Sequence, residues 1–202
     1  LKRYGTFAGT GITSFRMPSN LQYIAPETFR NCEQLKTFYI GKAFRGKINY
    51  GEEGDPDTLF LYYAPIRLIQ IDKENTSYQL QNEILYTRDG HILCQALKND
   101  NADSQLTIPS CVTEIADGAF YRNSEFGAIE VKGSLERIGI SAFACADVGS
   151  FYVKGGVNYL DRGSFYQSAI SEWRCHGGVK KYEKSAFQDV DATNGYAIDM
   201  NA

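Results

Sequence analysis

The 202-residue chain contains little of what catalysis and metal binding need. It has two histidines, His91 and His176, and none of its five cysteines forms a CxxC pair. Catalysis by a nucleophile requires a base and an orienting acid that converge on it, and the sequence shows no such set. Cys175 directly precedes His176, but adjacent strand residues point to opposite faces. We therefore expect no enzyme activity, no catalytic residue, no metal site and no cofactor.

Long apolar runs and basic stripes are absent as well. No stretch approaches the roughly eighteen apolar residues that cross a bilayer. The net charge is −3 and the pI is near 5.5, so no basic stripe is available to neutralise phosphates. We expect neither membrane insertion by this segment nor nucleic-acid binding. Hydrophobic residues at 43% and charged residues at 22% are typical of a folded protein with one elongated core.

The cysteines do not suggest a disulfide framework. They are spread through the chain, and we interpret them as buried, reduced side chains, with Cys111 the most exposed. Whether any of them pair stays open, although an odd number leaves at least one thiol unpaired within the chain.

What the sequence does contain is a phenylalanine that recurs every 22 or 23 residues, at Phe120, Phe143, Phe165 and Phe187. An apolar residue lies five positions before each one and another lies eight before. Phe7 and Phe29 continue the pattern near the N-terminus. This interval predicts a stacked-repeat protein in which each phenylalanine is an inner anchor.

A second apolar group follows each anchor with the spacing LxxLxL. Its last positions alternate with the period of two that a strand requires. We expect these strands to pair in parallel along a solenoid, with a short helical turn or extended return segment between them. The copies are Ile12, Phe15, Met17; Leu35, Phe38, Ile40; Ile66, Ile69, Ile71; Phe126, Ile129, Val131; Val148, Phe151, Val153; and Ile170, Trp173, Cys175, with partial copies at Leu106, Ile108 and at Tyr196, Ile198.

Two places break the repeat. Sixteen residues instead of eight separate Phe44 from Phe60, which fits the anchor, and the excess at 49–57 is polar, so we expect a surface loop. The second break spans about 72–105. There two apolar segments flank Asp89 and Gly90, a pairing that favours a type I′ hairpin turn. We expect a β-hairpin that protrudes from the solenoid, with Ala96 and Leu97 in place of the anchor pair.

Several strings in the chain resemble the BspA-like leucine-rich repeat proteins of bacterial cell surfaces. They are IPSCVTEIADGAF, MPSNLQYIAPETFRNCEQLKTFYI, and IDKENTSY followed by EILYTRDGHIL. The likeness covers nearly the whole chain, but a cysteine follows the anchor at Cys32 and not at Asn123. It implies an α/β-type leucine-rich repeat superhelix, right-handed, with a parallel sheet on its concave face. The expected domain is 1–202, with about eight repeats of which the first and last are incomplete.

The resemblance also implies a location and a function. We expect an extracellular or cell-surface protein of a bacterium that acts as a binding or adhesion module for a protein or glycan on a host or bacterial surface. No signal peptide is visible, and neither end has a polar cap, so we expect a piece of a longer array. The alternative is a structural spacer that projects another domain. Oligomeric state is left open.

A partner would contact the outward residue between the last two inward residues of each strand. Because equivalent strands lie side by side, these residues should form one row on the concave face. Tyrosine suits such a surface because it combines a large apolar ring with a polar tip. The candidate binding residues are Tyr39, Gln70, Thr107, Glu130, Tyr152 and Arg174. A solvated strand face without a partner is an equally good interpretation.

Overall fold

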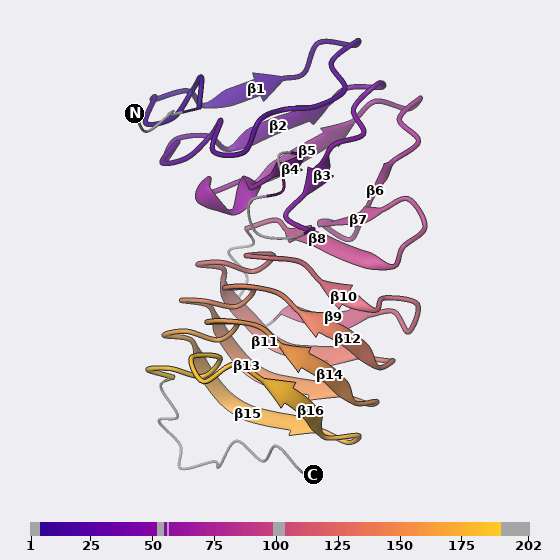
Figure 1. The fold of residues 1–202 in the computed structure, drawn as a ribbon, viewed down its shortest axis with the longest axis vertical. Coiled ribbons are helices and arrows are strands. Elements are labelled where there is room, and N and C mark those ends of the chain that lie inside the picture. The colour runs from indigo at the N-terminus through magenta and orange to yellow at the C-terminus, as the bar shows by residue number, and fades with distance from the viewer. Residues whose placement is uncertain (1–4, 52–54, 56, 99–103, 191–202) are drawn as a thin grey trace.

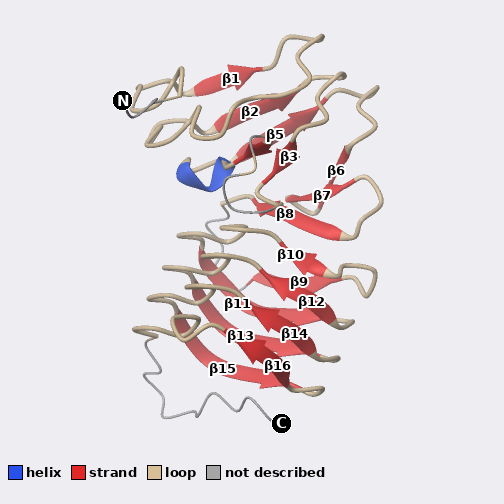
Figure 2. Ribbon diagram, viewed as in Figure 1, coloured by secondary structure: helices blue, strands red, loops and turns tan. Residues whose placement is uncertain are grey.

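The chain forms a parallel-strand β-solenoid of about seven turns with almost no helix (Figure 1). This computed structural model describes residues 5–51, 55, 57–98 and 104–190. The expected solenoid of stacked parallel strands is confirmed. The α/β character and the helical turns are not, because the described part of the chain contains a single helical element, the three-residue 3-10 helix η1 (Leu61–Tyr63) (Figure 2).

The LxxLxL segments form the long strands, as their alternation predicts. Those in the N-terminal half make a three-stranded parallel sheet of β1 (Ser14–Arg16), β2 (Thr37–Ile40) and β5 (Leu68–Ile71). Those in the C-terminal half make a four-stranded parallel sheet of β9 (Ser104–Ile108), β11 (Ser124–Val131), β13 (Asp147–Val153) and β15 (Ala169–Cys175).

The return segments of the C-terminal half are strands as well, and those of the N-terminal half are mostly turns, so helices are scarce. The return strands are β10 (Glu114–Ile115), β12 (Leu135–Ile138), β14 (Val157–Leu160) and β16 (Val179–Tyr182), and each pairs in parallel with the next. The apolar residues five and eight positions before each anchor lie in or next to these strands. Val112 and Ile115, like Leu135 and Ile138, are fully buried and close the core from the second side.

The anchor phenylalanines stack in a column through the C-terminal half. The rings of Phe120 and Phe143 are 4.6 Å apart, those of Phe143 and Phe165 are 5.0 Å apart, and those of Phe165 and Phe187 are 5.1 Å apart, all within 10° of parallel. Phe120, Phe143 and Phe165 are fully buried, whereas Phe187 is partly buried. The aromatic anchors therefore bind each turn of the solenoid to its neighbours.

The turns around the anchors stack through backbone hydrogen bonds. The amides of Phe7, Phe120, Phe143 and Phe165 each donate to a carbonyl of the following turn, as Phe143 does to Ser164 at 2.7 Å. The residue two positions after each anchor has a positive φ, between 50° and 70°. Its amide also reaches the next turn, as that of Arg122 does to Ala144 at 2.9 Å. The left-handed conformation costs about 1 kcal/mol per residue. It directs the backbone amides toward carbonyl acceptors in the next turn.

The expected hairpin exists, but it belongs to a three-stranded antiparallel unit of β6 (Tyr78–Gln81), β7 (Ile84–Thr87) and β8 (Ile92–Ala96). The predicted type I′ turn at Asp89 and Gly90 is wrong, because only Gly90 has a positive φ. The two-residue turn is instead Asn82–Glu83, with φ of 49° and 62°, and it joins β6 to β7. Residues 88–91 form a longer loop, closed by a bond from the Gly90 amide to the Thr87 carbonyl.

This unit does not protrude from the solenoid; it separates two hydrophobic cores. β8 pairs in parallel with β10 and so extends the sheet of return strands β10, β12, β14 and β16. Leu85 packs in the N-terminal core, whereas its neighbours Ile84 and Tyr86 pack in the C-terminal core. Ala96 and Leu97, the expected substitutes for the anchor pair, are both buried. The insertion is therefore covered on both faces.

The shorter insertion is a surface loop only in part. It is flanked by the paired strands β3 (Lys47–Ile48) and β4 (Thr58–Leu59). Asn49, which was expected in the loop, is fully buried, and its side-chain oxygen accepts from the Leu61 amide at 2.7 Å. Phe60 is not the anchor, because Leu61 occupies the buried position.

Two expectations remain, on the cysteines and on the last partial copy. Cys32, Cys94 and Cys175 are buried free thiols, Cys111 is exposed as expected, and Cys145 is half-exposed. The partial copy at Tyr196 and Ile198 lies outside the described residues.

Candidate functional site

The outward row consists of the residues between the last two inward positions of the long strands, which are exposed or half-buried. The structure divides it into two segments. Arg16, Tyr39 and Gln70 are neighbours across β1, β2 and β5. Thr107, Glu130, Tyr152 and Arg174 are neighbours across β9, β11, β13 and β15. Gln70 and Thr107 belong to different sheets, so the single continuous row that we expected is interrupted between them.

Sequence reasoning missed Arg16 in the first segment. Its guanidinium lies 4.0 Å from the centre of the Tyr39 ring, in a cation–π contact. The Tyr39 hydroxyl donates to the Asp72 carboxylate at 2.9 Å. The backbone amide of Glu74, together with that hydroxyl, lowers the pKa of Asp72 below its usual value. Arg16 could have been found, because it lies between Phe15 and Met17, the last two inward residues of the first triplet.

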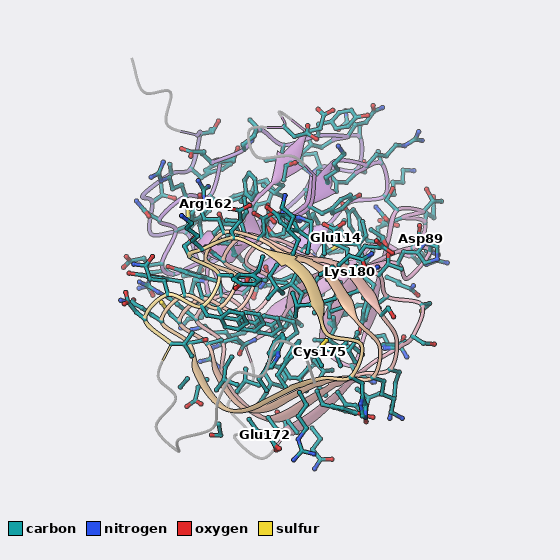
Figure 3. All side chains as sticks on the ribbon, turned by 60° about the horizontal axis from the view of Figure 1, so that its bottom comes forward. Asp89, Glu114, Arg162, Glu172, Cys175 and Lys180 are labelled. Carbon is teal, nitrogen blue, oxygen red and sulfur yellow. The ribbon has the colours of Figure 1, made fainter. Side chains whose placement is uncertain are left out.

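The second segment carries charges of both signs. Glu130 accepts from Lys132 at 2.6 Å and lies 3.5 Å from the Nζ of Lys154, and the bond from Lys132 is the main cause of its lowered pKa. The Arg174 guanidinium lies 2.5 Å from the Glu172 carboxylate. Glu172 projects outside the coil while Cys175 lies within it (Figure 3).

Tyrosine and histidine complete this segment. The rings of Tyr152 and His176 meet edge to face with their centres 5.6 Å apart. Cys175 is buried while His176 is exposed, so the two neighbours face opposite ways as the strand period predicts. The second segment thus presents polar, charged and aromatic groups on a rigid parallel sheet, a composition suited to recognition.

The opposite sheet carries a different group of side chains, centred on Arg137 of β12. Its guanidinium contacts Glu114 at 2.9 Å and Asp117 at 2.5 Å in the preceding turn, and Asp161 at 2.9 Å in the following turn. Gly139 makes room for this contact, because a Cβ there would lie 2.4 Å from the Asp117 carboxylate. The arrangement bonds the turns together.

Burial sets the charge state of this group. It raises the pKa of Asp117 to about 6, although Arg137 and the Ile140 amide favour the carboxylate. Burial also opposes the charge on Arg137, but the Asp117 and Glu114 carboxylates outweigh it and raise the arginine pKa above its usual value. The role of these residues is cohesion of the solenoid, because their hydrogen-bonding groups are directed at one another.

Within the described ranges, no three His, Cys, Asp or Glu side chains converge as metal ligands would. Asn75, in the sequence Asn-Thr-Ser, is 3% exposed. Its side-chain amide donates to the carbonyls of Gly41 and Phe44 and is therefore bonded within the fold. No helix in the part of the chain that the structure describes is long and apolar enough to span a membrane.

Comparisons with known proteins agree with this fold. The family model of the BspA type leucine rich repeat region matches six copies, over residues 3–50 and 90–194. No curated protein matches the sequence. The crystal structure of the pneumococcal vaccine antigen PcpA is similar, with a TM-score of 0.61 and 16% identity over 87% of this chain.

The chain corresponds to 58% of that PcpA chain. A leucine-rich repeat protein from Eubacterium ventriosum has a TM-score of 0.49 and 14% identity, over 95% of this chain and 68% of its own. At these identities the likeness to PcpA concerns the fold alone.

Proposed function

This chain belongs to the BspA-type leucine-rich repeat family, and from that premise we propose that it is a non-enzymatic binding or adhesion module of a bacterial cell-surface or secreted protein. Proteins of this family generally have binding or structural roles in bacterial surface proteins. The module engages a protein or a glycan on a host or bacterial surface through the outward row.

The observation that carries the proposal is the second segment of the outward row. Its four strands hold Glu130, Tyr152 and Arg174 in fixed register, about 4.8 Å apart from strand to strand. Glu130 is partly neutralised by two lysines, and Tyr152 is half-buried against His176. A partner meets these groups already positioned, which lowers the entropy lost on binding.

The test is to replace Tyr39, Tyr152 and Arg174 together by alanine. The matched control replaces Tyr23, Tyr182 and Arg45, which are exposed residues of the same types outside the outward row. The chain is used as bait for extracellular matrix and for bacterial surfaces, and cell attachment is measured with both variants. We expect the first variant to lose binding while its circular dichroism and melting temperature stay unchanged, and the control to bind normally.

The alternative function is a structural spacer that projects another domain. The column of stacked rings from Phe120 to Phe187 favours it, because it ties successive turns into a continuous rod. A spacer requires no intact outward row. Unchanged binding and unchanged cell attachment after the triple replacement would therefore reject the binding module and leave the spacer.

A further inference from the structure

A pocket lies at the edge of the solenoid formed by η1 and the turns around the anchors, away from the outward row. It encloses about 290 Å³ and is lined by residues from four separate segments of the chain. The residues that give it chemical character are Glu33, Tyr62, Tyr63, Lys98, Tyr121 and Arg122. Its volume is at the small end of the range for ligand pockets, roughly 300 to 1,000 Å³, so it suits a single small unit.

The tyrosine rings of the pocket are fixed by their neighbours. Tyr62 packs against Tyr63 with ring centres 4.5 Å apart and against Tyr121 at 5.6 Å. Phe60 meets both η1 tyrosines edge to face, at 5.7 and 6.4 Å. Gly118 lies under Tyr62 so closely that a Cβ there would be 2.2 Å from the Cγ of the ring. These contacts hold an aromatic wall in place before any ligand arrives.

The charged groups of the pocket favour a ligand that is negatively charged. Lys98 and Arg122 contribute two positive charges and Glu33 one negative charge. The Arg122 guanidinium lies 5.3 Å from the centre of the Tyr121 ring, so it borders the aromatic wall. Arg30 stacks on Tyr63 at 5.9 Å from outside the lining, and its charge is paired with Glu27 at 2.9 Å. Aromatic cages also bind cations, but the two cationic side chains disfavour that here.

We propose that this pocket binds one carboxylate-bearing pyranose unit of an acidic saccharide. Such a sugar has an apolar C–H face that packs on the tyrosine rings, and hydroxyl groups around its edge that Glu33 and the tyrosine hydroxyls can bond. Its carboxylate pairs with Arg122 and Lys98. The helix η1, which follows the insertion at 49–57, provides two of the three tyrosines in the aromatic wall, so the site depends on this chain's departure from the regular repeat.

The experiment measures binding of the full chain to three acidic oligosaccharides by titration calorimetry. The probes are tetragalacturonate, a hyaluronan tetrasaccharide and sialyllactose, each beside its methyl ester, which has the same sugar ring but no charge. We expect saturable binding of at least one acid and about tenfold weaker binding of its ester. No binding of any acid, or equal binding of acid and ester, would overturn the proposal.

Variants locate the binding site. Tyr121→Ala should weaken binding of the acid about tenfold or more, and Arg122→Asn should abolish the preference for acid over ester. Asparagine is chosen because Arg122 has a φ of 52°, which asparagine tolerates. Tyr166→Ala is the matched control, since Tyr166 occupies the same position two turns later, outside the pocket.

Binding that survives both pocket variants, or that is weakened equally by Tyr166→Ala, would overturn the site. The alanine variant of Tyr39, Tyr152 and Arg174 should bind the saccharide normally. The pocket and the outward row are therefore tested separately, and the failure of one proposal does not imply the failure of the other.

Discussion

The ring of Tyr62 occupies the space that a side chain at Gly118 would need. A Cβ at residue 118 would lie 2.2 Å from the Cγ and 2.4 Å from the Cδ1 of that ring. Gly118 has a φ of 58°, but this is not what requires glycine, because Glu27 and Ser141 adopt similar angles at the equivalent position of other turns. The contact with the insertion is what excludes a side chain.

We therefore expect Gly118→Ala to destabilise the fold by about 1 to 3 kcal/mol, the usual cost of overpacking. Gly163→Ala is the matched control. Gly163 has a φ of 61° at the same position of a later turn, and its nearest atom would be at an ordinary 3.5 Å. Urea unfolding of both variants separates the clash from the backbone strain. Equal losses of stability would show that Tyr62 does not pack there.

Phe143→Ala should lower the free energy of unfolding by roughly 3 to 5 kcal/mol, because it opens a cavity in the column of anchors. The ring lies between those of Phe120 and Phe165 and is fully buried. Tyr23→Ala, at a site 50% exposed, should change stability by less than about 0.5 kcal/mol. A loss below about 1 kcal/mol at Phe143 would contradict the stacked anchor.

Asp117 should make stability fall as the pH rises. Its pKa is raised by burial to about 6 in the folded chain, above the value near 3.8 in the unfolded chain, so the folded state binds the proton more tightly. Its stabilising contribution is complete below about pH 4 and is lost as the pH rises through about 6. Asp117→Asn should remove this component.

The difference in unfolding free energy between wild type and Asp117→Asn isolates the contribution of Asp117 from that of the other carboxylates. Asp55, Asp72 and Asp89 have lowered pKa values in the folded chain. Their contribution to stability is therefore lost as the pH falls, not as it rises. Chemical unfolding of wild type and Asp117→Asn between pH 3.5 and 7.5 is the measurement. Parallel stability curves over about pH 4 to 6 would show that the proton is not held at Asp117.

Arg137→Met should be strongly destabilising at pH 7, by up to about 3 to 5 kcal/mol, because three carboxylates lose their shared cation. Arg174→Met is the matched control. The Arg174 side chain is 69% exposed and pairs with Glu172, so its loss should cost less than about 1 kcal/mol. Similar losses for the two variants, measured by urea unfolding, would mean that Arg137 is solvated instead of bonded between turns.

The repeat spacing was enough to predict the long strands and the anchors, because a fixed interval must place equivalent residues on top of one another. It left the return segments open between a helical turn and an extended segment, since the pair at five and eight positions before an anchor fits either. The hairpin turn was misplaced because Asn82–Glu83 lacks the glycine that marks such turns, whereas Asp89–Gly90 has it.

The candidate binding residues could be selected only as a pattern. Their registers within each sheet follow from the spacing, but the interruption between Gln70 and Thr107 depends on how the insertion packs, which the sequence does not show. The tyrosine pocket was missed entirely. Tyr62 and Tyr121 are 59 positions apart in sequence, and no periodicity links an insertion to a regular turn.

The strands β7 and β8 contact both cores, so the insertion is not an accessory that could be removed. Leu85 and Tyr86 are adjacent in the chain, yet each fills a different core. A shortened chain that joined Asp72 directly to Ser104 would expose the apolar end of each half to water. The regular turns are interchangeable in principle, whereas both halves of the molecule need this irregular segment to cover their cores.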